Sequence, residues 1–196
     1  AVDVGRGQLA WQLRTDPRVV VLERTNMRHL TTLPEPVGCA AIDVSFISLR
    51  LVLPAVAALV TAGGWIVALV KPQFEAGRAE ADRGAGVISD PAVHQRVLRG
   101  LLGWLREQRA RSDQRLFAHG LTASPIVGRD GNHEYLLRLQ VGPVALEQPR
   151  EHERAAGDAR AAPVTDMTDE AIETVIAAAF APSQSGRAPS TREEHP

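Results

Sequence analysis

The chain has 196 residues, of which 44% are hydrophobic and 23% are charged, and its formal net charge is −1. This composition is that of a globular protein and excludes a wholly disordered chain, a collagen and a disulfide-rich scaffold. The single cysteine, Cys39, cannot form an intramolecular disulfide, and no basic start followed by an apolar run marks a signal peptide. Nothing therefore argues for secretion, and we expect a cytoplasmic protein.

The charge is unevenly distributed along the chain. Residues 151–196 carry nine acidic residues against four arginines, which gives this part a net charge of −5 and leaves residues 1–150 at +4. A mildly basic folded part permits contact with nucleic acid phosphates without requiring it. Of the 22 basic residues, only Lys71 is a lysine.

Apolar runs of strand length recur through the first half of the chain. They lie at residues 19–22, 39–42 and 65–70, and residues 1–3 are predicted to be the end of a further strand. Between them, the apolar spacing predicts a short helix over residues 8–13 and a buried helix over residues 49–60. Continuous apolar strands that alternate with helices are typical of a mostly parallel sheet covered on both faces, so we expect the α/β class.

Residues 51–70 are twenty residues without a charge and form the one candidate for a membrane span. Length alone would allow a span. Pro54 and the pair Gly63 and Gly64 divide the stretch into two runs that are each too short. We therefore interpret it as a helix, a turn and a buried strand, and we expect no membrane partner.

The second half of the chain is predicted to contain one long helix and two final strands. Asp90 followed by Pro91 is a favourable helix start, and valine and leucine recur after it at helical spacing. Strands are predicted over residues 115–121 and 134–141, and the short loop between them indicates antiparallel neighbours. Residues 74–89 are rich in glycine, alanine and charge without periodicity, which predicts an irregular, mobile loop beside a strand end.

The composition shifts to alanine, proline, glutamate and arginine after Pro149. We expect one domain over residues 1–148 and an acidic, Ala- and Pro-rich tail over residues 149–196 that is largely disordered. Within that tail, the spacing of apolar residues predicts a short amphipathic helix over residues 168–180.

Five polar residues are expected to meet at one edge of the sheet. In a parallel α/β sheet, ligands bind beyond the carboxyl ends of the strands, and an antiparallel final strand begins at that same edge. The five residues are Asp3, Asn26, Asp43, Lys71 and Glu134. A lone carboxylate at a strand end is as often a helix cap as a functional group, but the convergence of five groups from distant segments favours a site.

Lys71 is the sharpest of these signals because arginine fills every other basic position. Lysine differs from arginine in being a compact charge whose pKa can be lowered by burial. A site that needs a proton acceptor, or a point charge near a reacting oxygen, requires lysine. The alternative is chance, since one lysine must lie somewhere.

Other residue patterns give little support for a metal, hydrolase or nucleotide-binding site. The six histidines show no metal-ligand spacing, so we expect structural or surface roles for them and no metal. The chain has no Gly-x-Ser-x-Gly elbow and no phosphate-binding loop, and Gly5-x-Gly7 is too short for a dinucleotide fingerprint.

Six longer motifs resemble one known family. They are residues 2–11 (VDVGRGQLAW), 23–26 (ERTN), 43–49 (DVSFISL), 70–75 (VKPQFE), 86–91 (GVISDP) and 131–136 (GNHEYL). In this order they are similar to the TlyA (hemolysin A) family of FtsJ-like ribose 2′-O-methyltransferases, over roughly residues 1–141. The motifs around Asp43 and Lys71 are long and specific.

The resemblance implies a Rossmann-like methyltransferase sheet with an antiparallel final strand. It also implies 2′-O-methylation of ribose, with S-adenosylmethionine as cofactor, ribosomal RNA or ribosomal subunits as partner and cytidine as target. Enzymes of this kind use a Lys-Asp-Lys-Glu tetrad, and Asp43, Lys71 and Glu134 match its last three members. No metal is implied.

In that mechanism Lys71 orients the ribose 2′-hydroxyl and helps to deprotonate it. Asp43 and Glu134 hold Lys71 in place and balance its charge, and Asp43 also lies beside the sulfonium of the cofactor. Asp3 is expected to accept hydrogen bonds from the cofactor ribose, as an acid does at this place in other nucleotide-binding sheets. Asn26 is expected to contact the adenine edge.

The family also has an S4 RNA-binding domain, a first strand with a glycine-rich loop and a first tetrad lysine, none of which has a match here. We therefore expect an N-terminally truncated sheet whose first strand is missing. Arg78 and Arg83, within residues 74–89, are placed to close over RNA.

Three alternatives remain: a catalytically inactive RNA- or ribosome-binding remnant, a membrane-active hemolysin and an acyl hydrolase. RNA binding without cofactor binding would indicate the first, and liposome leakage the second.

Overall fold

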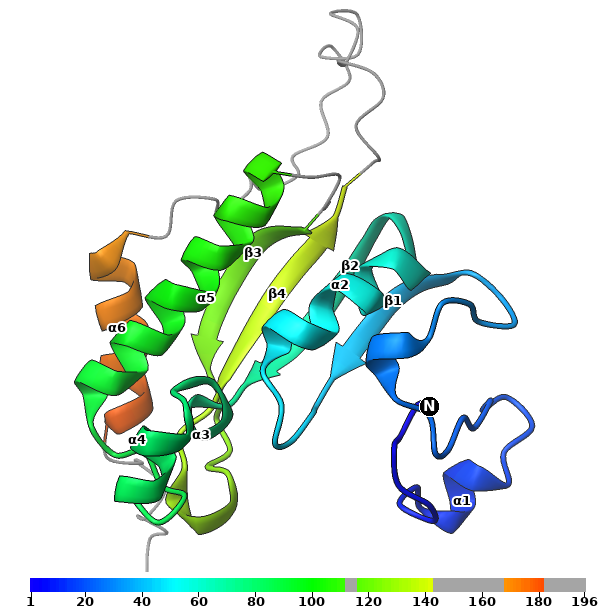
Figure 1. The fold of residues 1–196 in the computed structure, drawn as a ribbon, viewed down its shortest axis with the longest axis horizontal. Helices are drawn as coiled ribbons and strands as arrows, with labels where there is room; N and C mark the ends of the chain where they lie inside the picture. Colours follow the sequence, from blue (N-terminus) through cyan, green and yellow to red (C-terminus); the bar gives the residue numbers. More distant parts are fainter. Residues whose placement is uncertain (112–115, 143–167, 182–196) are drawn as a thin grey trace, which may run out of the picture.

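The computed structural model describes residues 1–111, 116–142 and 168–181 (Figure 1). Its centre is a four-stranded sheet in the order β1-β2-β4-β3. The strands are β1 (Val37–Ile42), β2 (Val60–Val70), β3 (Leu116–Ala123) and β4 (Tyr135–Val141). The pair β1 and β2 is parallel, whereas β4 runs antiparallel to both β2 and β3. The α/β class and the antiparallel final strand are thus confirmed, in a sheet whose strand directions are mixed.

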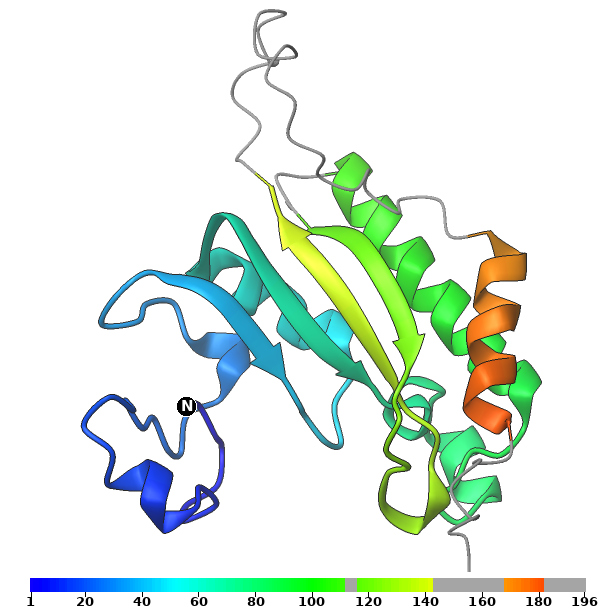
Figure 2. The ribbon, with the colours of Figure 1, turned by 180° about the vertical axis from the view of Figure 1, so that it is seen from behind.

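Two helices cover one face of this sheet. Figure 1 shows α2 (Leu49–Leu59) and α5 (Pro91–Arg111) in front of the strands, and Figure 2 shows the strands from behind. Alternate residues of each strand point to one face. Ile66 on β2 and Leu139 on β4 are therefore fully buried beneath the helices, whereas Trp65 on the opposite face is 43% exposed. Cover on both faces was expected, but no helix of the described segments crosses that opposite face of β1 and β2.

The N-terminal segment lies beyond β1, at the edge of the molecule (Figure 1). It contains α1 (Trp11–Arg14) and the 3₁₀ turn η1 (Met27–His29). The two strands predicted here are reduced to one parallel bridge between Val2 and Leu22, whose backbone hydrogen bonds are 2.8 and 3.0 Å long. A single bridge aligns the two chain segments without forming a full ladder.

Strand β2 is longer than predicted. The turn expected around Gly63 and Gly64 lies within the strand, where its pairing with β1 is interrupted. Val60 pairs with Val37, and the next pair along β1 is Cys39 with Trp65, so several residues of β2 are extra. Gly63 there has a φ of 82°, a conformation that glycine adopts without strain. Among the described residues, no helix is long and apolar enough to cross a membrane.

The prediction of an irregular loop over residues 74–89 is wrong for part of that segment. It contains α3 (Pro72–Glu75) and α4 (Arg78–Arg83). Neither helix is long enough to show an apolar stripe, so periodicity could not reveal them. The end of the segment is fixed by Asn132, whose side chain accepts a hydrogen bond from Ile88 N at 3.1 Å and donates one to Gly86 O at 3.0 Å.

The long second helix and one helix of the tail agree with expectation. Asp90 Oδ1 accepts a hydrogen bond from Ala92 N at 2.9 Å, as a residue that caps α5 should. The amphipathic helix predicted near the C-terminus is α6 (Asp169–Phe180), which packs against α5 and β3 and buries Ile172 and Ile176. The disorder predicted for the rest of residues 149–196 lies outside the described residues.

Candidate functional site

Lys71 and Asp43 form an ion pair where the two parallel strands end. Asp43 follows the last residue of β1 and Lys71 follows the last residue of β2, so both lie at the carboxyl edge of the sheet. Lys71 Nζ is 2.6 Å from Asp43 Oδ1 and 3.4 Å from Ser45 Oγ. The lysine side chain is only 13% exposed, whereas that of Asp43 is 72% exposed. A lysine whose side chain is mostly buried is thus held by a carboxylate that remains open to a ligand.

Glu134 lies at the same edge, as the antiparallel strand predicts. Val70 pairs with Tyr135, so Lys71 and Glu134 are the residues next beyond that pair. The carboxylate of Glu134 is buried and accepts a hydrogen bond from Gln73 Nε2 at 3.3 Å. The structure therefore brings the ends of three strands together, with Glu134 linked to the segment that carries Lys71.

A second carboxylate, Glu75, joins the loops that follow β1 and β2. Its Oε1 accepts a hydrogen bond from Leu49 N at 2.6 Å, and its Oε2 accepts one from Ser48 Oγ at 2.7 Å. These donors are at the beginning of α2, where backbone N–H groups lack helical partners and a negative charge is favourable. The sequence analysis did not single out Glu75, although it lies within the motif that contains Lys71.

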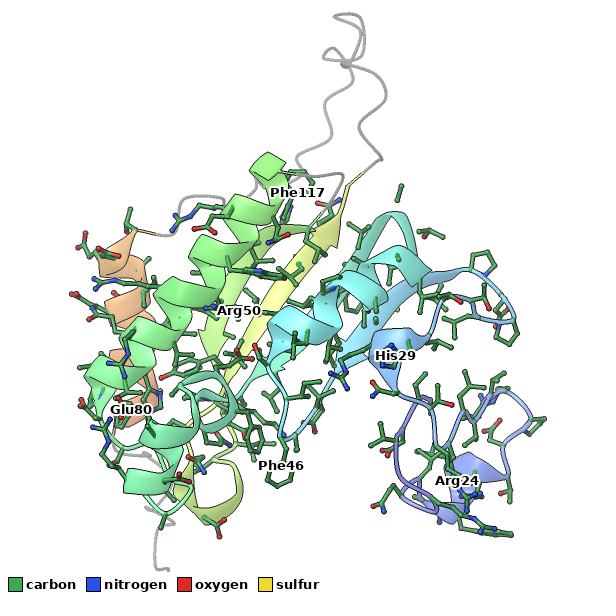
Figure 3. The ribbon with its side chains drawn as sticks, viewed as in Figure 1. Arg24, His29, Phe46, Arg50, Glu80 and Phe117 are labelled. Carbon is green, nitrogen blue, oxygen red and sulfur yellow. The ribbon has the colours of Figure 1, made fainter. Side chains whose placement is uncertain are left out.

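The ring of Phe74 lies near Lys71 and packs against a second ring, that of Phe46. Phe46 is 90% exposed, and its ring centroid is 4.9 Å from that of Phe74. Lys71 Nζ is 6.0 Å from the centroid of Phe74. The backbone of Phe46 has a φ of 61°, which is strained for a residue with a bulky side chain. Figure 3 shows Phe46 on the loop between β1 and α2, pointing away from the sheet.

A cavity of about 730 Å³ lies between the N-terminal segment and β1. Its walls are mainly valine and leucine, and its polar residues include Asp3 and Asp43. Asp3 Oδ1 already accepts a hydrogen bond from Gly5 N at 2.6 Å, so this carboxylate also closes its own turn. A volume of this size is typical of a site for a small organic ligand.

Glu23 fixes the turn that precedes this cavity. Its carboxylate forms a two-pronged ion pair with Arg14 and accepts a hydrogen bond from Gly7 N at 2.7 Å. The Arg14 guanidinium holds the pKa of the Glu23 carboxyl below its usual range. The ends of the two N-terminal segments are thus tied together where Asp3 faces the cavity.

Asn26 is placed differently from the other predicted residues. Its side-chain oxygen accepts a hydrogen bond from Arg28 N at 3.1 Å and so caps η1. Its neighbour Met27 lines the cavity, but Asn26 is not among the residues of the cavity wall. Asp3 and Asp43 therefore share one cavity, and Asn26 lies outside it.

A buried histidine supports the strand that begins after Glu134. His94 is fully buried, with Nδ1 2.7 Å from Tyr135 Oη and Nε2 2.8 Å from Ile88 O. Since a carbonyl only accepts, Nε2 carries the proton and Nδ1 accepts from the tyrosine hydroxyl. Burial lowers the pKa of His94 and raises that of Tyr135. The ring of Phe180, from α6, packs against His94 at a centroid distance of 5.1 Å.

Among the described residues, no three histidine, cysteine, aspartate or glutamate side chains lie together so that they could hold a metal ion.

The sequence is similar to those of several bacterial proteins. It is 49% identical over 142 residues to the "Putative rRNA methyltransferase YqxC" of Bacillus subtilis, covering 71% of this chain and 48% of that protein. It is 48% identical over 146 residues to the "16S/23S rRNA (cytidine-2′-O)-methyltransferase TlyA" of Mycobacterium tuberculosis, covering 71% of this chain and 50% of that protein. The chain thus spans about half the length of these relatives.

Solved structures and a family model agree with these similarities. A putative hemolysin from Streptococcus thermophilus superimposes with a TM-score of 0.71 and 36% identity, over 91% of this chain and 56% of that one. A putative hemolysin from Lactococcus lactis gives a TM-score of 0.64 and 42% identity, over 71% and 64% of the two chains. The model of the FtsJ-like methyltransferase family matches residues 1–141. The chain belongs to the FtsJ-like methyltransferase family.

Proposed function

We propose that this chain carries the active site of an S-adenosylmethionine-dependent enzyme that methylates the 2′-hydroxyl of a cytidine ribose in ribosomal RNA. The observation that carries the proposal is the 2.6 Å pair of Lys71 and Asp43 at the sheet edge where Glu134 also lies. Membership in the methyltransferase family and the activity in the name of the Mycobacterium tuberculosis relative support the reaction class and the RNA substrate.

The residues around the cavity fit this cofactor. When bound, S-adenosylmethionine supplies a methyl group on a positively charged sulfur. Asp3 would accept hydrogen bonds from ribose hydroxyls, and the valine and leucine walls would pack against the adenosine. Asp43 is largely exposed and borders the same cavity, so its negative charge would favour a sulfonium. Asn26 would bind the adenine edge only through a change from its present role as a cap.

Lys71 is the group that we assign to the ribose hydroxyl. A hydroxyl is a poor nucleophile until its proton is hydrogen-bonded or removed. Lys71 Nζ would orient the hydroxyl and, in its neutral form, accept the proton, while Asp43 at 2.6 Å holds the lysine and offsets its charge. Glu134, whose hydrogen bond in this structure is to Gln73, would help to hold the lysine from the same sheet edge. Holding the attacking oxygen in line with the transferred group accounts for most of the expected rate.

Phe46 and Phe74 would bind the nucleobase of the target. Unpaired bases stack on exposed aromatic rings, and the exposed ring of Phe46 packs against Phe74, whose ring centroid is 6.0 Å from Lys71 Nζ. A base stacked there would bring its own ribose toward Lys71. Arg83, an exposed residue of α4 that also pairs with Glu80 at 3.2 Å, would contribute positive charge toward RNA.

The test is transfer of labelled methyl groups from S-adenosylmethionine to ribosomal RNA that lacks the modification. We expect label in 2′-O-methylcytidine with the wild-type chain. Label in a base atom, or no label from a folded chain that binds the cofactor, would refute the assigned reaction. RNA binding without cofactor binding would instead identify a non-catalytic RNA-binding protein.

A further inference from the structure

The carboxylate of Glu134 lies in a narrow slot between two other residues. Glu134 is 8% exposed, so most of its surface is covered by protein. One wall of the slot is the amide of Gln73, which donates from Nε2 to Glu134 Oε1 at 3.3 Å. The other wall is the backbone of Gly128, in the loop between β3 and β4.

A side chain at position 128 would crowd the carboxylate of Glu134. A Cβ atom at this position would lie 2.6 Å from Glu134 Oε1 and 2.8 Å from Glu134 Cδ, closer than real Cβ atoms approach other atoms. Its backbone is outside the left-handed region that favours glycine, so the conformation does not explain the residue. The closeness of the Glu134 carboxylate explains why this position holds a glycine.

The wall formed by Gly128 is held firmly. Gly128 N donates to Asn132 O at 2.8 Å, and Ser124 N donates to Glu134 O at 2.8 Å across the neck of the loop. Asn132 is in turn bound to the backbone of residues 86–88. The loop therefore cannot widen at Gly128 without breaking several hydrogen bonds.

The other wall is held at a cost. Gln73 Oε1 is buried and has no hydrogen-bond partner among the described residues. A buried acceptor without a donor is unfavourable, and such groups are few in folded proteins. The amide of Gln73 is thus oriented to donate to Glu134 while its own carbonyl oxygen remains unsatisfied.

We propose that Gly128 and Gln73 are positioning residues that fix the direction of the Glu134 carboxylate at the sheet edge that holds Lys71. This role rests on the proposed function, in which Glu134 helps to hold the lysine. The slot itself is a property of the fold and can be measured without any methyl transfer.

A double-mutant cycle in urea unfolding tests the slot. Gly128→Ala should lower the urea midpoint of the wild-type chain, because the new methyl group displaces the carboxylate. In a Glu134→Ala background the two closest crowding atoms are absent and only Asn132 O, 3.2 Å from the new Cβ, still crowds it, so most of this loss should disappear. Equal losses in the two backgrounds would overturn the proposal. Gly103→Ala is the matched control, since a Cβ there meets no atom within 4 Å, and its effect should be the same in both backgrounds.

Gln73→Leu gives a second cycle if Gly128→Ala fails to fold. It removes the amide donor with little change in volume, and its effect on the midpoint should also depend on whether Glu134 is present. A loss that does not depend on Glu134 would overturn the assignment of Gln73.

Steady-state kinetics of the same variants test the positioning role. Gly128→Ala and Gln73→Leu should lower kcat for methyl transfer while the KM for S-adenosylmethionine stays unchanged, and Gly103→Ala should change neither. A folded Gly128→Ala chain with wild-type kcat would refute the role. If the wild-type chain transfers no methyl group, the proposed function fails, and the unfolding cycles still decide whether the slot exists.

Discussion

Lys71 Nζ lies 2.6 Å from Asp43 Oδ1, at the point where two adjacent parallel strands end. The lysine side chain is mostly buried and the aspartate side chain is mostly exposed. The pair therefore presents the Asp43 carboxylate to the solvent, and this carboxylate holds the lysine ammonium. Parallel strands bring their carboxyl ends to one edge, and this is why residues far apart in sequence form this contact. The proposed reaction depends on this pair.

Lys71→Ala should lower the rate of methyl transfer by about 100-fold or more, the usual scale for a group that moves a proton. The affinity for S-adenosylmethionine should change little, because Lys71 is not a wall of the cavity. Lys71→Arg retains the charge but not the compact ammonium and should also be slow. Single-turnover assays and calorimetry check the two effects, and full activity of Lys71→Ala would remove the residue from the mechanism.

Phe46→Gly should separate RNA binding from stability. Removing the ring should weaken binding of a single-stranded target by about 1–3 kcal/mol, the scale of one base stacked on an aromatic ring. The free energy of unfolding should stay level or rise, because glycine adopts the left-handed conformation of this residue without strain. Phe46→Trp keeps an aromatic ring and should bind the RNA about as well as the wild-type chain. Fluorescence anisotropy and urea unfolding measure the two quantities, and unchanged RNA affinity of Phe46→Gly would contradict the stacking role.

Asp3→Ala should weaken binding of S-adenosylmethionine by about 1.5–3 kcal/mol, the usual contribution of hydrogen bonds to a charged group. The same change also removes the acceptor for Gly5 N. Asp3→Asn is the matched control, because its side-chain oxygen can still accept from Gly5 N while the charge is lost. An affinity that is unchanged in both variants would exclude Asp3 from the cofactor site.

The strand ends could be predicted from the sequence because they depend on short-range patterns. Apolar runs predicted β1, the second half of β2 and β4. Asp43, Lys71 and Glu134 are each adjacent to one of these runs. The antiparallel direction of β4 followed from the short loop before it and placed Glu134 at the edge that holds Lys71. Family motifs then assigned the expected roles to Asp43, Lys71 and Glu134, and those roles stay predictions.

The contacts around those residues could not be predicted, because they depend on the paths of loops in three dimensions. The pairing of Phe46 with Phe74 joins two different loops, and Asn132 reaches the backbone of residues 86–88. The adenine-binding role of Asn26 stays a prediction. Its side chain accepts a hydrogen bond from Arg28 N and caps a turn, a short-range contact of the kind that asparagine often makes with its neighbouring backbone.

His94 should make the stability depend on pH. Its neighbours include Tyr135 and the ring of His133, and Asp90 is the nearby acid. Burial lowers the pKa of His94 in the folded chain, so the unfolded chain binds more protons at mildly acidic pH. Stability should therefore be full above about pH 6.5, the ordinary histidine pKa, and should fall as the pH drops below it, by at most about 1.4 kcal/mol per pH unit.

The control for this pH dependence is His94→Gln, which cannot titrate. The variant should be less stable at pH 7, because it loses packing and hydrogen bonds, but its unfolding free energy should fall less between pH 7 and pH 5. Urea unfolding at several pH values provides the comparison. Identical slopes for the two chains would show that His94 does not titrate in this range.

Calorimetric titration of this chain with S-adenosylmethionine tests the central claim most directly. We expect saturable binding at one site with an affinity in the micromolar range, because Asp3, Asp43 and the apolar wall of the cavity form a site of suitable size. No heat of binding from a chain that circular dichroism shows to be folded would contradict the claim that this cavity holds the methyl donor.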